Sequence, residues 1–130
     1  MPMIHFDVYR GRTPAEISQL LEVAHKVFVE VLEIPEGDRY QVVHQHEPYE
    51  MVIQDTGLGF TRSQQVVVMS IFSKERREDQ KQRLYRELVE ALETRCGIAP
   101  NDVMMSFFIN GDADWSFGFG RAQFLTGELT

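Results

Sequence analysis

The chain has 130 residues, a net charge of −7 and 11% aromatic residues. This length suits one domain with one core, and the acidic balance argues against nucleic acid as a partner. No apolar run approaches the roughly 20 residues of a membrane span, and no secretory leader is expected. Cys96 is the only cysteine, which excludes an intrachain disulfide and favours a cytoplasmic location; we expect it to be a small buried hydrophobic residue.

The first half of the chain predicts a strand, a helix and a second strand. Residues 3–9 (MIHFDVY) alternate in polarity, as strands do when one face is buried. In the helix that follows, Thr13 is a good N-cap, Pro14 suits the first helical position and Glu16 completes a capping box. Residues 40–46 (YQVVHQH) predict the second strand.

The second half of the chain repeats this order. Residues 66–72 (VVVMSIF) predict a strand, 78–95 a helix that ends at Gly97, and 102–109 a further strand. The halves align without a gap at an offset of 64 residues, which pairs Ile4 with Val68, Val8 with Phe72, Arg10 with Lys74, Arg12 with Arg76, Leu20 with Leu84, Ile34 with Ile98 and Asp38 with Asp102.

A tandem βαβ repeat predicts an α/β (α+β) fold, with a four-stranded sheet and both helices on one face. We expect one domain over 1–130, with repeat halves at about 1–60 and 65–110 and an aromatic C-terminal tail at 111–130. The other sheet face needs a partner, which argues for an oligomer. Candidate apolar residues near that contact are Met69, Ile71, Met105 and Phe107.

Pro2 is the first candidate for chemistry. Initiator methionine is usually removed before a residue as small as proline, and this would leave a secondary amine at the chain terminus. Such an amine can accept or donate a proton, or attack a carbonyl to give an iminium ion. The alternative is that Pro2 is simply a common second residue. The catalytic hypothesis depends on the removal of Met1.

Lys74 and Arg76 directly follow a predicted strand, in the loop before the second helix. Ligands of α/β sheets tend to bind at the carboxyl ends of strands. Arg76 can hold a carboxylate in a bidentate fork, whereas Lys74 supplies a point charge; the alternative is two surface charges. If the inner strands ran parallel, Pro2 would lie at the opposite end of the sheet. The pocket would then need another arrangement, or a second subunit.

Asp38 and the pair His44 and His46 are further polar candidates. Asp38 is either a turn residue or a carboxylate that polarises water or sets the protonation of a neighbouring amine. His44 and His46 point the same way from a strand. No third ligand stands at a supporting spacing, so we favour sheet packing or a hydrogen bond and predict no metal site.

Several of these features together resemble the tautomerase superfamily, and within it the malonate semialdehyde decarboxylase family. They are Pro2, the doubled βαβ unit, DRYQVVHQHEPYEMVIQDTGLG at 38–59 and NGDADWSFGFGRAQFLTGEL at 110–129. The resemblance implies a homotrimer that uses no metal or organic cofactor. It also implies decarboxylation of malonate semialdehyde (3-oxopropanoate) to acetaldehyde and carbon dioxide, with hydration of acetylenic oxo-acids as a further activity.

Carried over by position, the resemblance implies Pro2, Asp38 and Arg76 as catalytic residues. The residues implied to bind substrate are Lys74, Arg76, Trp115, Phe117 and Phe124. Lys74 stands where the family has an arginine, so carboxylate binding is weakened or the preferred acid differs. The alternatives are a tautomerase or hydratase of 2-oxo acids, a 3-haloacrylate dehalogenase, or a non-catalytic oligomeric binding module. The expected partners are a small oxo-acid and further copies of the chain, without nucleic acid or membrane.

Overall fold

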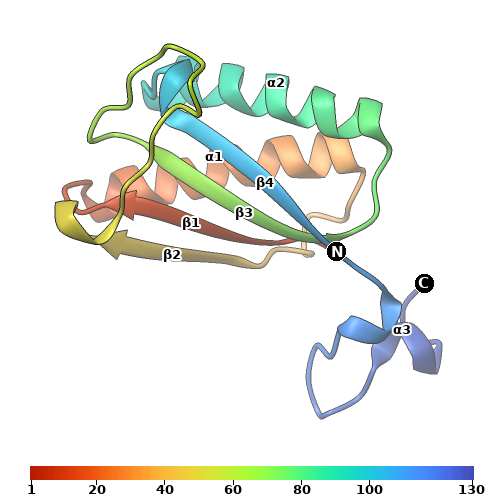
Figure 1. Ribbon diagram of the computed structural model, residues 1–130. Helices are drawn as coiled ribbons and strands as arrows, with labels where there is room; N and C mark the ends of the chain where they lie inside the picture. Colours follow the sequence, from red (N-terminus) through yellow and green to blue (C-terminus); the bar gives the residue numbers. More distant parts are fainter.

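The computed structural model, which describes residues 1–130, has a sheet layer and a helix layer (Figure 1). The strand order is β2-β1-β3-β4, and both long helices cover one face of the sheet, as predicted. No helix combines the length and the hydropathy that crossing a membrane requires. The main elements are β1 (Met3–Tyr9), α1 (Pro14–Leu32), β2 (Gln41–His46), β3 (Val67–Lys74), α2 (Glu78–Cys96) and β4 (Val103–Asn110).

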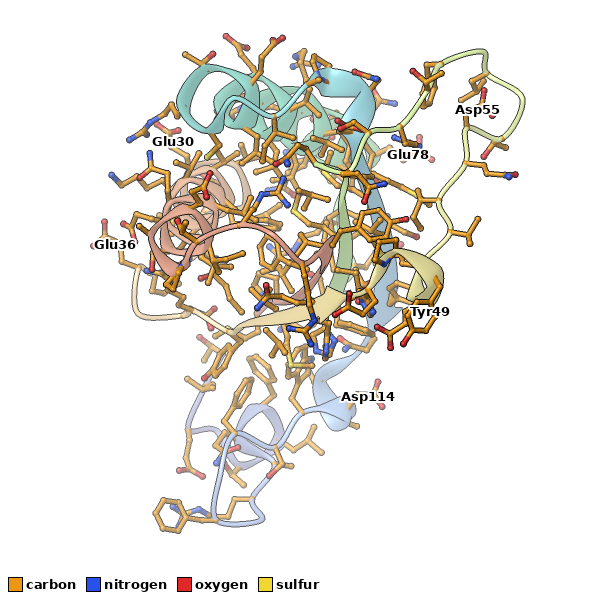
Figure 2. All side chains as sticks on the ribbon, turned by 90° about the vertical axis from the view of Figure 1, so that its left-hand side faces the viewer. Glu30, Glu36, Tyr49, Asp55, Glu78 and Asp114 are labelled. Atoms are coloured by element: carbon orange, nitrogen blue, oxygen red, sulfur yellow. The ribbon has the colours of Figure 1, made fainter.

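The short elements lie in the connections and in the tail. Two 3₁₀ turns, η1 (Pro48–Glu50) and η2 (Pro100–Asp102), precede β3 and β4 respectively. The tail after β4 contains a third turn, η3 (Asp112–Asp114), and the short helix α3 (Gln123–Thr126). In Figure 1 the tail projects from the end of β4, away from the two layers. Figure 2 shows it below the body, with Asp114 near its upper end.

The helices and the turns after them follow the predicted 64-residue offset. α1 and α2 each have 19 residues, and both their first and their last positions are separated by this offset. In the turn after α1, Asp38 N donates to Pro35 O at 3.0 Å; after the second helix, Asp102 N donates to Ala99 O at 2.9 Å. The predicted capping box of Thr13 is also present. The repeat is therefore confirmed in these segments.

The inner strands depart from this offset by one residue. Ile4 and Val8 are buried against the helices. Val68 and Phe72, which the gap-free alignment pairs with them, lie at the alternate positions of β3 that face away from the helices. Successive strand residues point to opposite faces, so a one-residue shift reverses every side chain. The gap-free alignment is therefore wrong within β1 and β3.

The same shift corrects the residues predicted for the uncovered face of the sheet. Met69 and Ile71 are fully buried in the core, and Met105 and Phe107 pack against that core. The face without helices, here called the open face, instead carries Met3, His5, Asp7, Val42, His44, Val68, Phe72, Met104 and Phe108. Its apolar centre includes a stack of Phe72 on Phe108, with ring centroids 5.0 Å apart.

The histidines of β2 lie on this open face and contact residues of β1. His46 Nε2 is 2.7 Å from Asp7 Oδ1, and His44 Nε2 is 3.4 Å from His5 Nδ1. These contacts agree with the interpretation of sheet packing and hydrogen bonding. Cys96, at the end of α2, packs against the core, and burial raises the pKa of its thiol.

The two inner strands, β1 and β3, are antiparallel. Met3 pairs with Phe72, so the beginning of β1 lies beside the end of β3. Pro2 and the loop that carries Arg76 therefore meet at one end of the sheet within a single chain. Lys74, predicted in that loop, is instead the last residue of β3 at the same end. The parallel arrangement considered from the sequence does not occur. Figure 1 shows the N-terminus at this end, where the tail also begins.

Candidate active site

The candidate active site is the end of the sheet where three separate segments meet. Pro2 is buried just before β1, Asp38 is 7% exposed in the turn after α1, and Arg76 is half-buried in the loop between β3 and α2. The charges of Asp38, Arg76 and Lys74 all act on the N-terminal amine. The fold therefore brings together the terminus and the polar residues that the sequence singled out.

The chain terminus lies in a desolvated, mostly cationic environment. In this structure the amine belongs to Met1, whose position marks where the terminus lies, and the Pro2 nitrogen is an amide. Burial lowers the pKa of the Met1 amine, and Arg76 adds to this effect; Asp38 raises the pKa, and Lys74 lowers it again. An amine at this place loses its proton more readily than an ordinary terminal amine.

Asp38 carries a carboxylate with an unused acceptor. Its Oδ2 is buried and has no hydrogen-bond partner, and burial raises the pKa of this carboxyl. The terminal ammonium, Arg76 and His25 oppose that rise through their positive charges. Asp38 is thus a turn residue, and its side chain is also available to a proton donor at the site.

Arg76 is anchored by neutral groups and forms no salt bridge. Its Nε donates to Ser73 Oγ at 3.3 Å, and its Nη1 donates to Leu32 O at 3.4 Å. Burial lowers the pKa of the guanidinium, and the charge of Asp38 opposes that change. A partly desolvated guanidinium without a carboxylate in contact gains strongly from an anion that can accept its remaining N–H groups.

Lys74 connects the sheet to the tail. Its Nζ is 2.9 Å from Asp112 Oδ1 and 4.1 Å from the centroid of the Phe124 ring. Its ammonium therefore has an acidic and an aromatic partner within the chain, although its charge still acts on the terminus. Sequence reasoning missed Asp112; the available signal was the acidic pair in DAD directly after the last strand.

The three predicted aromatic residues of the tail come together. Trp115 and Phe117 stack with centroids 5.3 Å apart and planes 7° apart, and Phe124 meets Phe117 edge-on at 5.5 Å. Tyr40, which sequence reasoning missed, lies 5.7 Å from Phe117 and links the cluster to the segment that carries Asp38. Aromatic walls of this kind exclude water and strengthen the electrostatic interactions beside them.

A large groove between α1 and α2 is a different feature from this site. It encloses about 1010 Å³ and is lined by several glutamates, including Glu22, Glu30, Glu87 and Glu90. In Figure 2, the label of Glu30 marks the helix α1 at this side. Lys26, Arg39 and Arg95 also line the groove, so its charge is mixed. Neither the chain terminus nor Asp38 lines it, and we place the candidate site at the end of the sheet instead.

Comparisons with known proteins agree with the fold. Two family models, both described as tautomerase enzymes, match residues 38–118 and 2–61. The probable tautomerase YrdN of Bacillus subtilis (strain 168) is 52% identical over 129 residues, which are 99% of this chain and 100% of YrdN. A fused 4-OT described as a symmetric trimer shares the fold, with a TM-score of 0.77 over 96% of this chain and 98% of its own, at 17% identity.

Two solved structures are much more similar. One is a malonate semialdehyde decarboxylase studied for its decarboxylase and hydratase activities, with 51% identity and a TM-score of 0.95 over 98% of this chain and 99% of its own. The other is FG41 malonate semialdehyde decarboxylase inhibited by 3-bromopropiolate, with 38% identity and a TM-score of 0.93 over 98% and 97%. The chain therefore belongs to the tautomerase family of enzymes, and its resemblance to the malonate semialdehyde decarboxylases within that family is confirmed.

Proposed function

We propose that this protein decarboxylates malonate semialdehyde (3-oxopropanoate) to acetaldehyde and carbon dioxide, without a cofactor, through the amine of Pro2 after removal of Met1. The observation that carries the proposal is a desolvated chain terminus beside the buried Asp38 and the unpaired Arg76. Further support comes from the 51% identical decarboxylase, whose study included a mutant with alanine in place of the proline at its first position.

In this mechanism Arg76 binds the carboxylate of the substrate through its planar fork. Lys74 adds positive charge but keeps its contacts with Asp112 and Phe124. This positioning holds the bond between C1 and C2 perpendicular to the plane of the C3 carbonyl, so that its electrons can enter the carbonyl π-system. The apolar wall of Trp115 and Phe117 excludes water and favours carbon dioxide, a neutral leaving group.

The bond-breaking step needs an electron sink at C3. In one form of the mechanism, the Pro2 ammonium donates a hydrogen bond to the C3 carbonyl oxygen. The electrons of the C1–C2 bond then form the enolate, carbon dioxide leaves, and protonation at C2 gives acetaldehyde. In the other form, the free amine attacks C3, and loss of water gives an iminium ion, which accepts the same electron pair to become an enamine as carbon dioxide leaves. Protonation of the enamine at C2 restores an iminium ion, and water hydrolyses it to acetaldehyde and the free amine.

Asp38 sets the balance between these protonation states. Desolvation and the two cations favour the free amine, whereas the Asp38 carboxylate favours the ammonium. Its unpartnered Oδ2 is the available acceptor for an N–H group at the terminus. We therefore assign Asp38 the role of holding the proton on the Pro2 amine.

The second candidate function is tautomerisation of a 2-oxo acid, favoured by the description of the 52% identical YrdN as a probable tautomerase. The same amine would move a proton between carbon and oxygen, with Arg76 again holding the carboxylate. Parallel assays separate the two functions. Release of acetaldehyde from 3-oxopropanoate supports the decarboxylase, whereas ketonisation of phenylenolpyruvate without that release supports the tautomerase.

We further propose that the chain forms a homotrimer through the open face, since Val42, Met104 and Phe108 are 39%, 40% and 48% exposed there. The similar fold of a trimeric fused 4-OT supports this assembly.

We expect the wild-type protein to sediment as a trimer and Phe108→Asp to sediment as a smaller species, because a charge cannot be buried at this contact without a partner. Leu58→Asp, in the connection before β3, is the control and should remain trimeric. A monomeric wild-type protein at micromolar concentration would contradict the proposal.

Pro2→Ala tests the catalytic amine. We expect turnover of 3-oxopropanoate to fall by about 10²-fold, the lower end for a proton-transfer group, because a primary amine remains. Intact-mass measurement should show that Met1 is absent from both proteins. Pro100→Ala, at the start of η2, is the matched control and should keep full activity. Retention of Met1 in an active enzyme, or unchanged turnover in Pro2→Ala, would refute the role of Pro2.

Arg76→Gln tests the carboxylate-binding role. Loss of the charged fork should lower kcat/KM for 3-oxopropanoate by about 10²- to 10³-fold, because the carboxylate loses its charge-assisted hydrogen bonds. Arg77→Gln removes the neighbouring exposed arginine, which pairs with Asp79, and should leave kcat/KM unchanged. Sedimentation should give the same oligomer for both variants. An Arg76→Gln protein that is inactive because it dissociates would show a structural role instead.

Asp38→Asn tests how far the buried carboxylate of Asp38 lowers the free energy of unfolding. Because burial raises the pKa of Asp38, the folded protein binds this proton more tightly than the unfolded chain, and wild-type stability increases as pH falls. At pH 7 we expect the variant to be more stable, because a neutral amide avoids the desolvation that raises the pKa of the carboxyl, and less active, because it no longer holds the proton on the Pro2 amine. The difference in urea unfolding should shrink toward pH 4. A variant that is less stable than the wild-type protein at pH 7 would contradict the view that burial of the Asp38 carboxylate destabilises the fold.

A further inference from the structure

The end of the sheet opposite Pro2 carries a second arginine at the position that corresponds to Arg76. Arg12 lies two residues before α1, just as Arg76 lies two residues before α2. The antiparallel pairing of β1 with β3 places these two loops at opposite ends of the sheet. Asp102, the counterpart of Asp38 in the repeat, is 2% exposed at this second end.

The second end differs from the first because the chain passes through it rather than beginning there. Arg12 Nη2 donates to the backbone oxygen of Gln65, in the segment just before β3, at 2.6 Å. Ser63 N donates to Asp102 Oδ1 at 2.7 Å, and Ser63 Oγ donates to Oδ2. Both oxygens of Asp102 are therefore occupied, and no chain terminus lies here. This end cannot perform the amine chemistry proposed for Pro2.

Arg12 nevertheless keeps an unused hydrogen-bonding group. Its Nη1 is buried and has no partner, and Arg12 forms no salt bridge. Glu16 exerts the largest opposing charge on Arg12, followed by Asp102, but the Glu16 carboxylate accepts a hydrogen bond from Thr13 N at 2.9 Å as part of the capping box. Burial lowers the pKa of the Arg12 guanidinium, which reflects the water that this group has lost.

Arg12 lines a pocket that has the size and charge for a small organic acid. The pocket encloses about 290 Å³ beside the start of α1 and the end of α2. Arg12 and Arg95 line it, opposed by a single carboxylate, that of Glu16. Arg95 also forms no salt bridge, and the raised pKa of the Cys96 thiol in the pocket wall keeps that group neutral. Such a pocket is attractive to an anion of a few heavy atoms.

We propose that this pocket is a second, non-catalytic site for a small carboxylate, held by the guanidinium of Arg12. Arg95 supplies additional positive charge at the pocket wall. Within the repeat, this site corresponds to the part of the candidate active site that contains Arg76, but it has no terminal amine. The proposal rests on the geometry of this end of the sheet and does not depend on the reaction catalysed at the other end.

Calorimetric titration with malonate tests the proposal. We expect two malonate ions per chain for the wild-type protein, one for Arg76→Gln and one for Arg12→Gln. Arg10→Gln is the matched control, because Arg10 lies in the same loop but pairs with Glu47, and it should still bind two. Arg12→Gln should keep full turnover of 3-oxopropanoate. If the wild-type protein binds one malonate ion per chain and Arg12→Gln also binds one, the second site is refuted, whatever the activity of either protein.

A second measurement does not require the glutamine variant to fold. Malonate should shift the backbone amide resonances of Gln19, Gln65 and Cys96 in the wild-type protein, because these residues line the pocket. Arg12→Lys keeps the charge without the fork. We expect the malonate affinity measured from these shifts to be about tenfold lower in this variant. Absence of shifts at these amides under saturating malonate would overturn the proposal on the wild-type protein alone.

Discussion

The antiparallel pairing of β1 with β3 is the constraint on which the rest of this structure depends. It pairs the first strands of the two βαβ units in opposite directions, so that the beginning of β1 lies beside the end of β3. A strand of seven residues is about 23 Å long. In a parallel pair, that distance would separate the chain terminus from the loop of Arg76. The parallel pairing of β2 with β1 places the turn of Asp38 beside the terminus, and the antiparallel pair brings the loop of Arg76 to the same end of the sheet.

Desolvation gives this end its chemical character. Three ionisable groups, the terminal amine, Asp38 and Arg76, all have pKa values displaced toward their neutral forms by burial, and each is partly restored by the charge of another. The arrangement leaves a carboxylate oxygen without a partner and a guanidinium without a salt bridge. Such groups cost folding stability and are retained where a ligand or a reaction needs them. The tail adds an aromatic wall, and Lys74 attaches that wall to the sheet.

The repeat explains why one scaffold has two related but unequal ends. Arg12 and Arg76 occupy the same place relative to their helices, and Asp38 and Asp102 end the same kind of turn. What differs is the path of the chain. At one end the chain begins, which leaves a free amine and an unoccupied acceptor on Asp38; at the other it continues through Ser63 and Gln65, whose groups occupy both oxygens of Asp102 and one nitrogen of Arg12. Chain connectivity, rather than a change in the charged residues, therefore distinguishes the candidate active site from the proposed anion site.

The sequence by itself determined the helices, their caps and the repeat, because these depend on interactions within a few residues: Thr13 with Glu16, and Gly97 in its left-handed conformation. It also named Pro2, Asp38 and Arg76, since their chemistry is a property of residue type. Only the tertiary structure decided which strand faces pointed inward, because a one-residue shift exchanges Ile71 for Phe72 without changing the apolar pattern. The contacts of Tyr40 and Asp112 likewise depend on where the tail lies. The antiparallel inner pair, which unites the site, is a long-range choice that no local pattern in the sequence specifies.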